Sequence, residues 1–334
     1  MHKIAKTLTM AAVTMTIANT SFAADKVLTV SHWAGPKHAM ATAVFPWMNE
    51  QYQACSGGSL SLKVENGLAP PPAQYDTIRD GVADIGWIVH GYTPGKFAAT
   101  KLAELPGNSG NAESMSIAFQ RTHEKYLAAA KEAKGVEVLA NFVHGPGLLN
   151  TVDKISSYKD VKGMKLRVGG GVANAVGEAL GVAGVNVPAP AVYETIASGV
   201  ADGVFFPAET LYSFKVAELI KHSYRNPDGM YTTSFAIILN SDTYNDLSDE
   251  HKACVDKTSG VGLAGQIGKF WDEADAFGIE RATADFGLEI VDASDEDRAY
   301  FTEITSGIEA SVLEGVAERG IDAKAALEYL RAQQ

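Results

Sequence analysis

The sequence predicts an α/β protein with two lobes, each a mostly parallel sheet flanked by helices. Strand-like and helix-like segments alternate along most of the chain and are joined by connections of a few residues. This alternation of strands and helices stops in a loop-rich stretch that begins near 145–151, and then resumes. The 334 residues, less a leader of 23, leave about 311, which is roughly twice the size of an ordinary domain.

The first 23 residues have the pattern of a secretory signal peptide. Lys3 and Lys6 precede an apolar run of small residues, and Ser21-Phe22-Ala23 ends it with the small-x-small spacing of a cleavage site. The run is too short and too rich in threonine to span a bilayer, and no later run approaches ~18 uninterrupted apolar residues. We therefore expect cleavage after about Ala23, export to the periplasm, and no direct insertion into the membrane.

The charge balance excludes some classes of partner. Lysine and arginine number 28 against 40 aspartates and glutamates, a net charge of −12 that becomes −14 without the two lysines of the leader. An acidic surface of that size argues against nucleic acid or anionic lipid as the partner. A small anionic ligand stays compatible, because one buried arginine can outweigh distant surface charge that salt screens.

The elements before the break are predicted to form the first lobe. The first helix ends at Gly57-Gly58, and the second closes on Gly81 before a buried strand. In chain order we expect a strand at 26–31, a helix at 39–53, a strand at 59–66, a helix and a strand within 75–89, a helix at 113–134 and a strand at 136–144.

The alternation of strands and helices resumes after the loop-rich stretch, and the chain ends in a mostly helical region. In chain order we expect a strand at 164–168, a helix at 172–181, a strand at 185–190, a helix at 191–199, and strands at 201–206, 232–240 and 288–291. From Ser248 to Thr283 the helical pattern is nearly continuous, with Ser248 as the N-cap. A helix of that length would be unusual inside one lobe, so it could lie across two.

The chain has two cysteines, Cys55 and Cys254. An even count in an oxidising compartment permits a disulfide, but 199 positions separate the two residues and the sequence gives no distance between them. A disulfide and two buried free thiols therefore both stay open.

Gly169-Gly170-Gly171 lies between a predicted strand and a predicted helix, as a dinucleotide-binding turn does. The third glycine of that fingerprint is absent, because the spacing leads to Asn174, and the turn lies in mid-chain. The alternative is a turn that uses the freedom of glycine at positive φ. We prefer the alternative.

Arg167 stands at the carboxyl end of the strand before these glycines. Open α/β sheets gather ligands at that edge, and a guanidinium there can hold a carboxylate or sulfonate through two parallel hydrogen bonds. The alternative is a surface arginine that pairs with one of the many acidic side chains.

Aromatic residues at other strand ends give a second signal. Trp33, Trp87, Tyr92 and Phe205-Phe206 would face a shared cleft if two lobes close on one ligand. Such walls suit an aromatic ring or a methylated cation, although ordinary core packing is the alternative for each residue.

Catalytic and metal-binding motifs are scarce. The sequence has no H-E-x-x-H, no G-x-S-x-G and no closely spaced His/Cys cluster. Ser156 and Lys159 match S-x-x-K, but the elements that accompany this motif are missing. His32, His90 and His144 lie near aromatic or Gly-rich turns, where a hydrogen-bonded or exposed histidine is the alternative to a catalytic base. The motifs by themselves therefore give little support to an enzyme, a cofactor site or a metal site.

Several blocks of the chain together resemble the extracytoplasmic solute receptors of tripartite ATP-independent periplasmic (TRAP) transporters. The resemblance extends over nearly the whole mature chain, and the order and spacing of the blocks carry it. The blocks are YDTIRDGVADIG, ELP, DVKGMKLRV, VNVPAPAVYETIASGVADG, KVAELIKHSY and LNSDTYNDLSDEHK.

The resemblance implies a binding protein that is not an enzyme and needs no cofactor or metal. It also implies a two-lobed fold of the periplasmic-binding-protein type, class II-like, with a long helix across both lobes. Because the chain crosses between lobes more than once, each lobe is discontinuous. We expect lobe I at 24–148 and about 235–275, and lobe II at 149–234 and about 276–334. The family closes its lobes round an organic acid and delivers it to membrane permease subunits, and its ligand-gripping arginine falls on Arg167.

One position departs from the family. Many members have D-G-x-E-N-P, with an asparagine that helps to hold the carboxylate, where this chain has DGVFFP at 202–207. Phe206 therefore replaces a hydrogen-bond donor with an apolar ring, which disfavours sugar acids and dicarboxylates. We expect an aromatic or other hydrophobic monocarboxylate, or a zwitterion that joins an acid to a methylated onium group.

The expected ligand contacts come from the arginine, the aromatic strand ends and one histidine. They are Arg167, Trp33, Trp87, Phe206, Phe205, Tyr92 and His144. Two alternatives to transport remain: a periplasmic receptor that presents the ligand to a membrane sensor, and a secreted enzyme that uses the Gly169 turn or Ser156.

Overall fold

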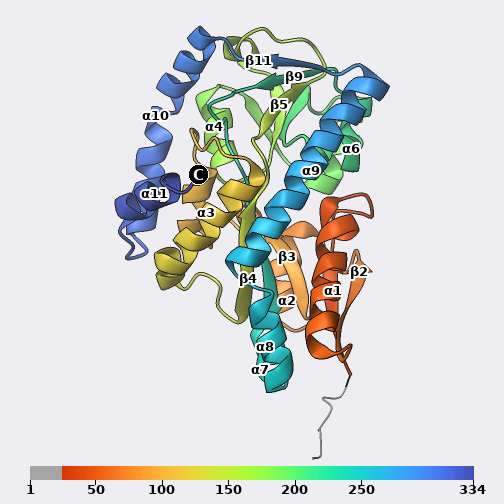
Figure 1. The fold of residues 1–334 in the computed structure, drawn as a ribbon. Coiled ribbons are helices and arrows are strands. Elements are labelled where there is room, and N and C mark those ends of the chain that lie inside the picture. Colours follow the sequence, from red (N-terminus) through yellow and green to blue (C-terminus); the bar gives the residue numbers. More distant parts are fainter. Residues whose placement is uncertain (1–24) are drawn as a thin grey trace, which may run out of the picture.

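The structure is a computed structural model that describes residues 25–334, so the predicted signal peptide lies outside the described residues. Two β-sheets form the centres of two lobes, which are stacked one above the other (Figure 1). The first sheet has the strand order β2-β1-β3-β10-β4. Its strands are β1 (Lys26–His32), β2 (Leu60–Asn66), β3 (Ile85–Val89), β4 (Val136–Val143) and β10 (Ser234–Asn240).

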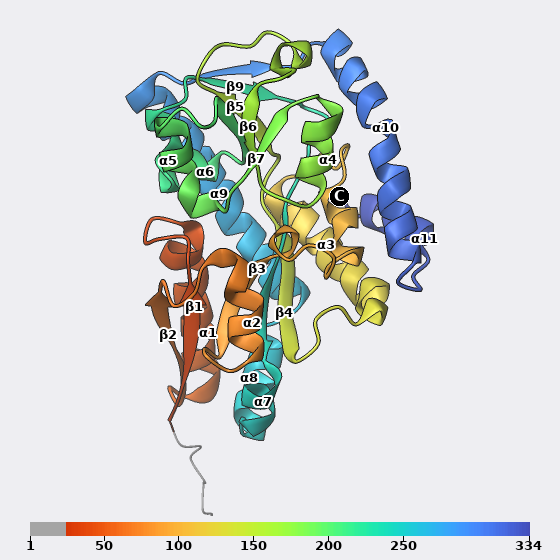
Figure 2. The ribbon, with the colours of Figure 1, turned by 180° about the vertical axis from the view of Figure 1, so that it is seen from behind.

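The second sheet has the order β11-β9-β5-β8-β6-β7 and is seen from behind in Figure 2. Its strands are β5 (Leu148–Thr151), β6 (Lys165–Val168), β7 (Ala183–Asn186), β8 (Gly203–Phe206), β9 (His222–Arg225) and β11 (Glu289–Asp292). The sequence did not predict β5 or β9. Both strands are only four residues long and β5 is buried on both faces, so neither shows the alternation that identifies a half-exposed strand.

Each sheet contains one reversed strand. β10 is antiparallel to β3 and β4, and β5 is antiparallel to β8 and β9, whereas the remaining pairs are parallel. These reversed strands begin directly after the two crossings between the lobes, at 144–147 and 226–233. The sheets are therefore mixed: β1 pairs in parallel with β2 and β3 in the first sheet, and β6 with β7 and β8, and β9 with β11, in the second.

Helices cover both sheets. Up to Ser213 they are α1 (Phe45–Ser56), α2 (Gln74–Arg79), α3 (Ala112–Lys125), α4 (Val172–Ala179), α5 (Val192–Ala197) and α6 (Glu209–Ser213). The later helices are α7 (Ser241–Asp246), α8 (Asp249–Lys257), α9 (Val261–Phe286), α10 (Asp295–Ala317) and α11 (Ala323–Arg331). None of the helices in residues 25–334 has the length and apolar character needed to cross a membrane.

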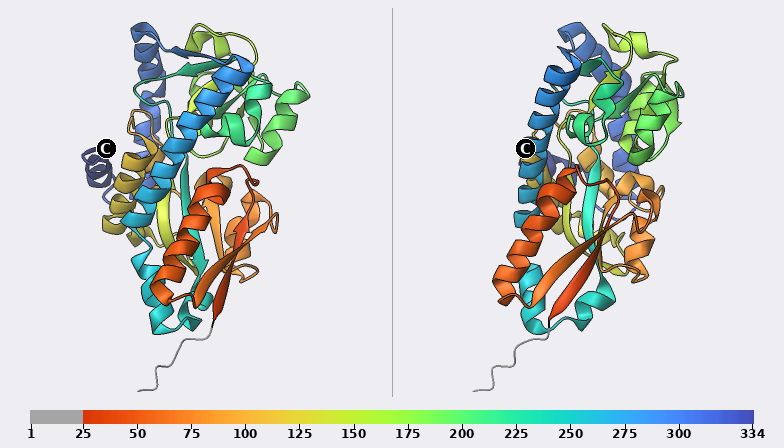
Figure 3. Two further views of the ribbon diagram at one scale, coloured as in Figure 1. Left: turned by 45° about the vertical axis from the view of Figure 1, so that its right-hand side comes forward. Right: turned by 90° about the vertical axis from the view of Figure 1, so that its right-hand side faces the viewer.

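The prediction of one helix from Ser248 to Thr283 was wrong at a single point. The structure ends α8 at Lys257 and starts α9 at Val261, because Gly260 takes φ 71° and interrupts the hydrogen-bond ladder. The 26 residues of α9 span about 39 Å and run along one side of both lobes (Figure 3).

α9 is attached to each lobe by a carboxylate that caps another helix. Asp272 accepts hydrogen bonds from the Ala112 and Glu113 N–H groups at the start of α3, at 2.7 and 3.1 Å. Asp275 accepts one from the Glu209 N–H at the start of α6, at 2.6 Å. Both carboxylates lie near the middle of α9, which therefore joins the two lobes at that point, and the strand crossings at 144–147 and 226–233 are the segments that can bend when the lobes move.

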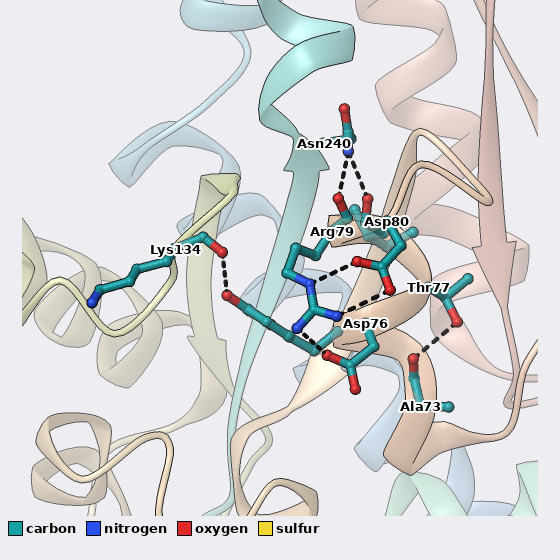
Figure 4. Close-up of polar contacts among 9 residues, drawn as sticks. Ala73, Asp76, Thr77, Arg79, Asp80, Lys134 and Asn240 are labelled. Atoms are coloured by element: carbon teal, nitrogen blue, oxygen red, sulfur yellow. Dashed lines mark hydrogen bonds and ion pairs between the residues drawn. The ribbon is translucent and has the colours of Figure 1, made fainter.

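Two further contacts tie distant parts of the first lobe together. The Asn240 side-chain amide donates to the Ile78 and Arg79 carbonyls, which closes the C-terminus of α2 against the end of β10 (Figure 4). Cys55 in α1 and Cys254 in α8 form a disulfide, which decides the alternative that the sequence left open.

The predicted lobe ranges stay a prediction. The strands of the first sheet lie within 26–143 and 234–240, and those of the second lie within 148–225 and 289–292. The C-terminal helix α11 returns to pack on α3, where Tyr329 contacts Tyr126 edge-on with 5.6 Å between ring centroids.

Candidate ligand-binding site

A cavity with about 460 Å³ of empty space lies where the two lobes meet. All the residues that the sequence proposed as ligand contacts line it, and their role in binding stays a prediction. The lining comprises Trp33, His38, Trp87, Val89, Tyr92, His144, Arg167, Gly169, Ala189, Phe205, Phe206, Pro207, Thr210, Phe214, Tyr231, Thr233, Phe235 and Trp271.

Strand ends from both lobes bring these side chains together. In the first lobe Trp33 follows β1 and Tyr92 lies in the turn after β3. In the second lobe Arg167 lies near the end of β6 and Phe206 is the last residue of β8. The carboxyl ends of these strands face the opposite lobe, as expected for ligand sites in α/β sheets.

Arg167 is the only arginine or lysine in the cavity lining, and only 2% of its surface is exposed. Its Nε donates to the Val187 carbonyl at 3.0 Å, and its Nη1 donates to the Phe205 carbonyl at 3.4 Å. Its Nη2 donates to the Tyr92 hydroxyl oxygen at 2.9 Å. A guanidinium has five N–H donors, so one N–H on each terminal nitrogen is left without a protein acceptor.

No carboxylate in residues 25–334 lies within ion-pair distance of Arg167. A buried charge without a counter-charge is costly unless a partner supplies one. The two free N–H groups match the two oxygens of a carboxylate. Arg167 therefore has the charge and the donors to hold an anion, and its role in binding stays a prediction.

Tyr92 joins the lobes at this point. Its hydroxyl oxygen accepts hydrogen bonds from Arg167 Nη2 and from the Ala189 N–H, both at 2.9 Å and both from the second lobe. A hydroxyl that accepts two hydrogen bonds still has its own proton to donate, and no described residue accepts it. Tyr92 can thus add a third donor to the anion site.

Aromatic rings form most of the remaining wall. Trp33 stacks on Trp87 with 4.0 Å between ring centroids and 13° between ring planes. The Trp33 indole N–H is already used, because it donates to the Trp87 carbonyl at 3.1 Å. On the other lobe the Arg167 guanidinium lies 4.5 Å from the centre of the Phe206 ring. A flat apolar group beside the anion would be enclosed by these rings.

Phe205 and Phe206 contribute in different ways. As neighbours on β8 they face opposite sides of the sheet, and their side chains belong to separate core clusters. The Phe205 carbonyl orients Arg167, whereas the Phe206 ring covers the guanidinium.

The glycine turn does not form a phosphate site. Glu104, from the first lobe, occupies the N-terminus of α4 and accepts a hydrogen bond from the Val172 N–H at 2.8 Å. A Cβ on Gly171 would lie 2.2 Å from the Glu104 carboxylate, and one on Gly170 would lie 2.5 Å from the Gly91 carbonyl oxygen. The glycines therefore allow the backbones of the two lobes to approach closely beside the cavity.

Ser156 lies outside the cavity and is exposed. Its N–H donates to Asp160 at 2.7 Å in the turn that begins at Ser157. The described residues contain no cluster of three or more His, Cys, Asp or Glu side chains suited to a metal ion. This part of the molecule gives no support to the enzyme alternative.

His38 and Glu209 form a buried contact between the lobes that the sequence did not indicate. His38 Nε2 lies 3.7 Å from a Glu209 carboxylate oxygen, and both side chains are almost fully buried. Burial lowers the pKa of His38 well below its usual range and raises the pKa of Glu209 to about 7. Both groups therefore favour their neutral forms, and the contact is not a strong ion pair.

The raised pKa of the buried Glu209 carboxyl group predicts that the stability of the protein depends on pH. Because its folded-state pKa is raised from 4.5 to about 7, its contribution to stability is complete below about pH 4.5 and is lost as the pH rises through 7. Relative to the wild type, Glu209→Gln should therefore gain about 2–3 kcal/mol in free energy of unfolding between pH 4.5 and 8. Urea unfolding of the wild type and the variant between pH 4.5 and 8 measures this difference in the free energy of unfolding. The exposed Glu178→Gln is the control, and a parallel pH profile for both variants would contradict the prediction.

Several lining residues escaped sequence analysis because they come from crossings and from a helix. Tyr231 and Thr233 lie in the crossing before β10, and Trp271 lies on α9. A crossing has no periodic pattern, and Trp271 reads as an ordinary core position of an amphipathic helix.

Comparison with known proteins places this geometry among binding proteins. The profile of bacterial extracellular solute-binding protein family 7 (DctP) matches residues 30–313. The outer membrane transporter protein TsaT of Comamonas testosteroni is 26% identical over 316 residues, which cover 94% of this chain and 93% of TsaT.

Three solved structures share the fold over almost their full length. A TRAP periplasmic solute-binding protein of Bordetella bronchiseptica with bound (R)- and (S)-mandelate is 38% identical, with a TM-score of 0.89 over 92% of this chain and 98% of that chain. A marine metagenome TRAP protein specific for aromatic acids, with 3-hydroxybenzoate, is 32% identical, with a TM-score of 0.87 over 93% and 98%. A Rhodoferax ferrireducens protein with copurified benzoate is 28% identical, with a TM-score of 0.87 over 92% and 97%.

Proposed function

Since the chain belongs to family 7 of the bacterial extracellular solute-binding proteins, the TRAP solute-binding proteins, we propose that it captures an aromatic monocarboxylate in the periplasm and delivers it to a TRAP permease. Proteins of this family and fold bind small organic acids and are not enzymes. The signal peptide, cleaved after about Ala23, would direct the chain to that compartment.

The observation that carries the proposal is the buried Arg167 with no carboxylate partner among the described residues. Its two free N–H groups and the Tyr92 hydroxyl form a three-donor site for one carboxylate. No second cationic side chain lines the cavity, so a dicarboxylate would leave one charge unpaired.

The rest of the cavity favours an aromatic ring. The stacked Trp33 and Trp87 and the Phe206 ring supply flat apolar walls, and Phe206 offers no hydrogen bond to the hydroxyls of a sugar acid. The cavity is bounded by residues of both lobes, as is usual for sites that enclose a small molecule. The mandelate, 3-hydroxybenzoate and benzoate of the three related structures support this ligand class.

Lobe closure would provide both the affinity and the signal to the permease. Tyr92 and Arg167 come from different lobes, so a ligand held by both stabilises the closed arrangement. The crossings at 144–147 and 226–233 would absorb the motion while α9 keeps its attachments.

A thermal-shift screen tests the ligand class. The protein is first freed of copurified ligand by denaturation, dialysis and refolding, and is then heated with benzoate, mandelate, succinate, glucuronate, glycine betaine or taurine. The aromatic acids should raise Tm, because a ligand at 100 times its Kd adds about 2.7 kcal/mol. Shifts with succinate or glucuronate alone would show that the argument from Phe206 is wrong. A shift with glycine betaine alone would instead identify the zwitterion class.

A further inference from the structure

His144 has a ring nitrogen that no residue in the described structure satisfies. The residue lies in the first crossing between the lobes, lines the cavity, and has 2% of its surface exposed. Its Nε2 atom is buried and has no hydrogen-bond partner among the described residues. Buried polar atoms are nearly always paired, so an unpaired one beside a ligand cavity points to a group on the ligand.

The other ring nitrogen determines what Nε2 can do. Nδ1 contacts the carbonyl oxygen of Gly145, and a carbonyl can only accept, so Nδ1 carries the proton. Burial lowers the pKa of His144 to about 4, and the ring is therefore neutral at physiological pH. In this tautomer Nε2 bears a lone pair and accepts one hydrogen bond.

The described residues around His144 provide no hydrogen-bond donor to Nε2. Tyr231 and Phe235 lie beside the ring with centroid distances of 5.6 and 5.9 Å, and their rings are apolar walls there. A carboxylate has no proton to donate, and an unsubstituted phenyl ring offers only C–H groups. A hydroxyl on the ligand meets the requirement and is neutral, so it adds no charge to the apolar cavity.

We propose that His144 is a specificity residue that accepts a hydrogen bond from a ligand hydroxyl, so that the preferred ligands are hydroxy-substituted aromatic carboxylates. The inference rests on the proposed function, because it adds a second recognition point to the anion site at Arg167. A site that hydrogen-bonds a ligand hydroxyl discriminates strongly against the analogue without the hydroxyl, because the polar group of the site is then left unpaired. An apolar site discriminates less strongly against a ligand that carries an additional hydroxyl.

A double-mutant cycle, with one change in the ligand and one in the protein, isolates the contact between the ligand hydroxyl and His144. Isothermal titration calorimetry compares benzoate with its three monohydroxy isomers, and phenylacetate with mandelate, on the refolded, ligand-free protein. The same titrations are made with His144→Leu, which removes the acceptor, and with His144→Gln, which restores an oxygen acceptor at similar reach. The melting curve of each variant without ligand verifies that it folds.

The wild type should bind at least one hydroxylated ligand ten-fold or more tightly than its parent compound. His144→Leu should lose that preference, so that it binds the hydroxylated ligand and its parent compound with similar affinity, and His144→Gln should recover part of the preference. If the variants do not fold, the imidazole ¹⁵N signals of His144 in the wild type replace them. The Nε2 signal should shift with the hydroxylated ligand and not with its parent.

Two different results would overturn the inference. If benzoate and phenylacetate each bind as tightly as all their hydroxylated partners, or if His144→Leu weakens both members of the preferred pair equally, the proposed function stands and the hydroxyl contact is refuted. If no aromatic acid binds at all, the proposed function fails together with it.

Discussion

Arg167→Ala is expected to abolish tight binding of the aromatic acid that the thermal-shift screen identifies. Truncating one partner of a buried, hydrogen-bonded charge pair costs about 2–5 kcal/mol, which corresponds to a loss of roughly 30-fold to several thousand-fold in affinity. The loss should be large here because the cavity lining contains no other lysine or arginine that could replace the guanidinium. Calorimetry with the wild type and the variant measures it.

Two further variants show whether the loss of affinity comes from the charge of Arg167, from its hydrogen-bond geometry, or from the removal of any arginine in this lobe. Arg167→Lys keeps the positive charge but cannot present two parallel donors, so it should recover only part of the affinity. Arg225→Ala removes an arginine of the same lobe that is exposed and paired with Asp292, and it should bind like the wild type. An unchanged dissociation constant for Arg167→Ala would refute the anion site. A melting temperature of the ligand-free variant close to that of the wild type would exclude misfolding as the cause of a loss.

Removal of the disulfide is expected to lower stability by about 4 kcal/mol without changing ligand binding. The Cys55–Cys254 bridge closes a loop across 199 positions, and the entropy lost by the unfolded chain grows with the length of the closed loop. The bridge connects α1 and α8, and neither cysteine lines the cavity. The double variant C55A/C254A should therefore unfold at a lower urea concentration and bind ligand within about two-fold of the wild type.

The wild type in reducing agent is the matched control for this prediction. Reduction should move its unfolding midpoint toward that of the double variant and should leave the double variant unchanged. Equal midpoints for the oxidised wild type and the double variant would mean that the bridge does not stabilise the fold. A change in the slope of the transition would instead indicate a more expanded unfolded state, as expected when a long loop is opened.

The sequence predicted the anion site because the relevant signals are local. A strand that ends at Arg167 before a helix start, and aromatic residues directly after other strands, can be read within a few neighbouring positions. Parallel strands place their carboxyl ends at one edge of a sheet, so positions far apart in the chain were expected to meet. All the proposed contacts do line one cavity, although their binding role still awaits the experiments above.

The same reasoning could not foresee how the site is completed. Glu104 fills the helix end beside Gly171, and Glu209 faces His38, through contacts between residues 68 and 171 positions apart. Glu104 belongs to the ELP block, but the sequence does not indicate the partner of either acid, because that partner is determined by the packing of one lobe on the other. The short strand β5 and the break at Gly260 were missed for a related reason, since a four-residue buried strand and a single glycine leave the local pattern almost unchanged.

The sequence by itself determined the acidic charge, the order of most strands and helices, and the arginine at a strand end, and it predicts the leader. These properties depend on composition and on periods of two or 3.6 residues, which a single segment carries. Only the tertiary structure decided that Cys55 and Cys254 pair, that Arg167 keeps two free donors, and that Nε2 of His144 has no partner among the described residues. The physical reason is that hydrogen-bond satisfaction and disulfide distance depend on groups brought together by folding, which no local pattern records.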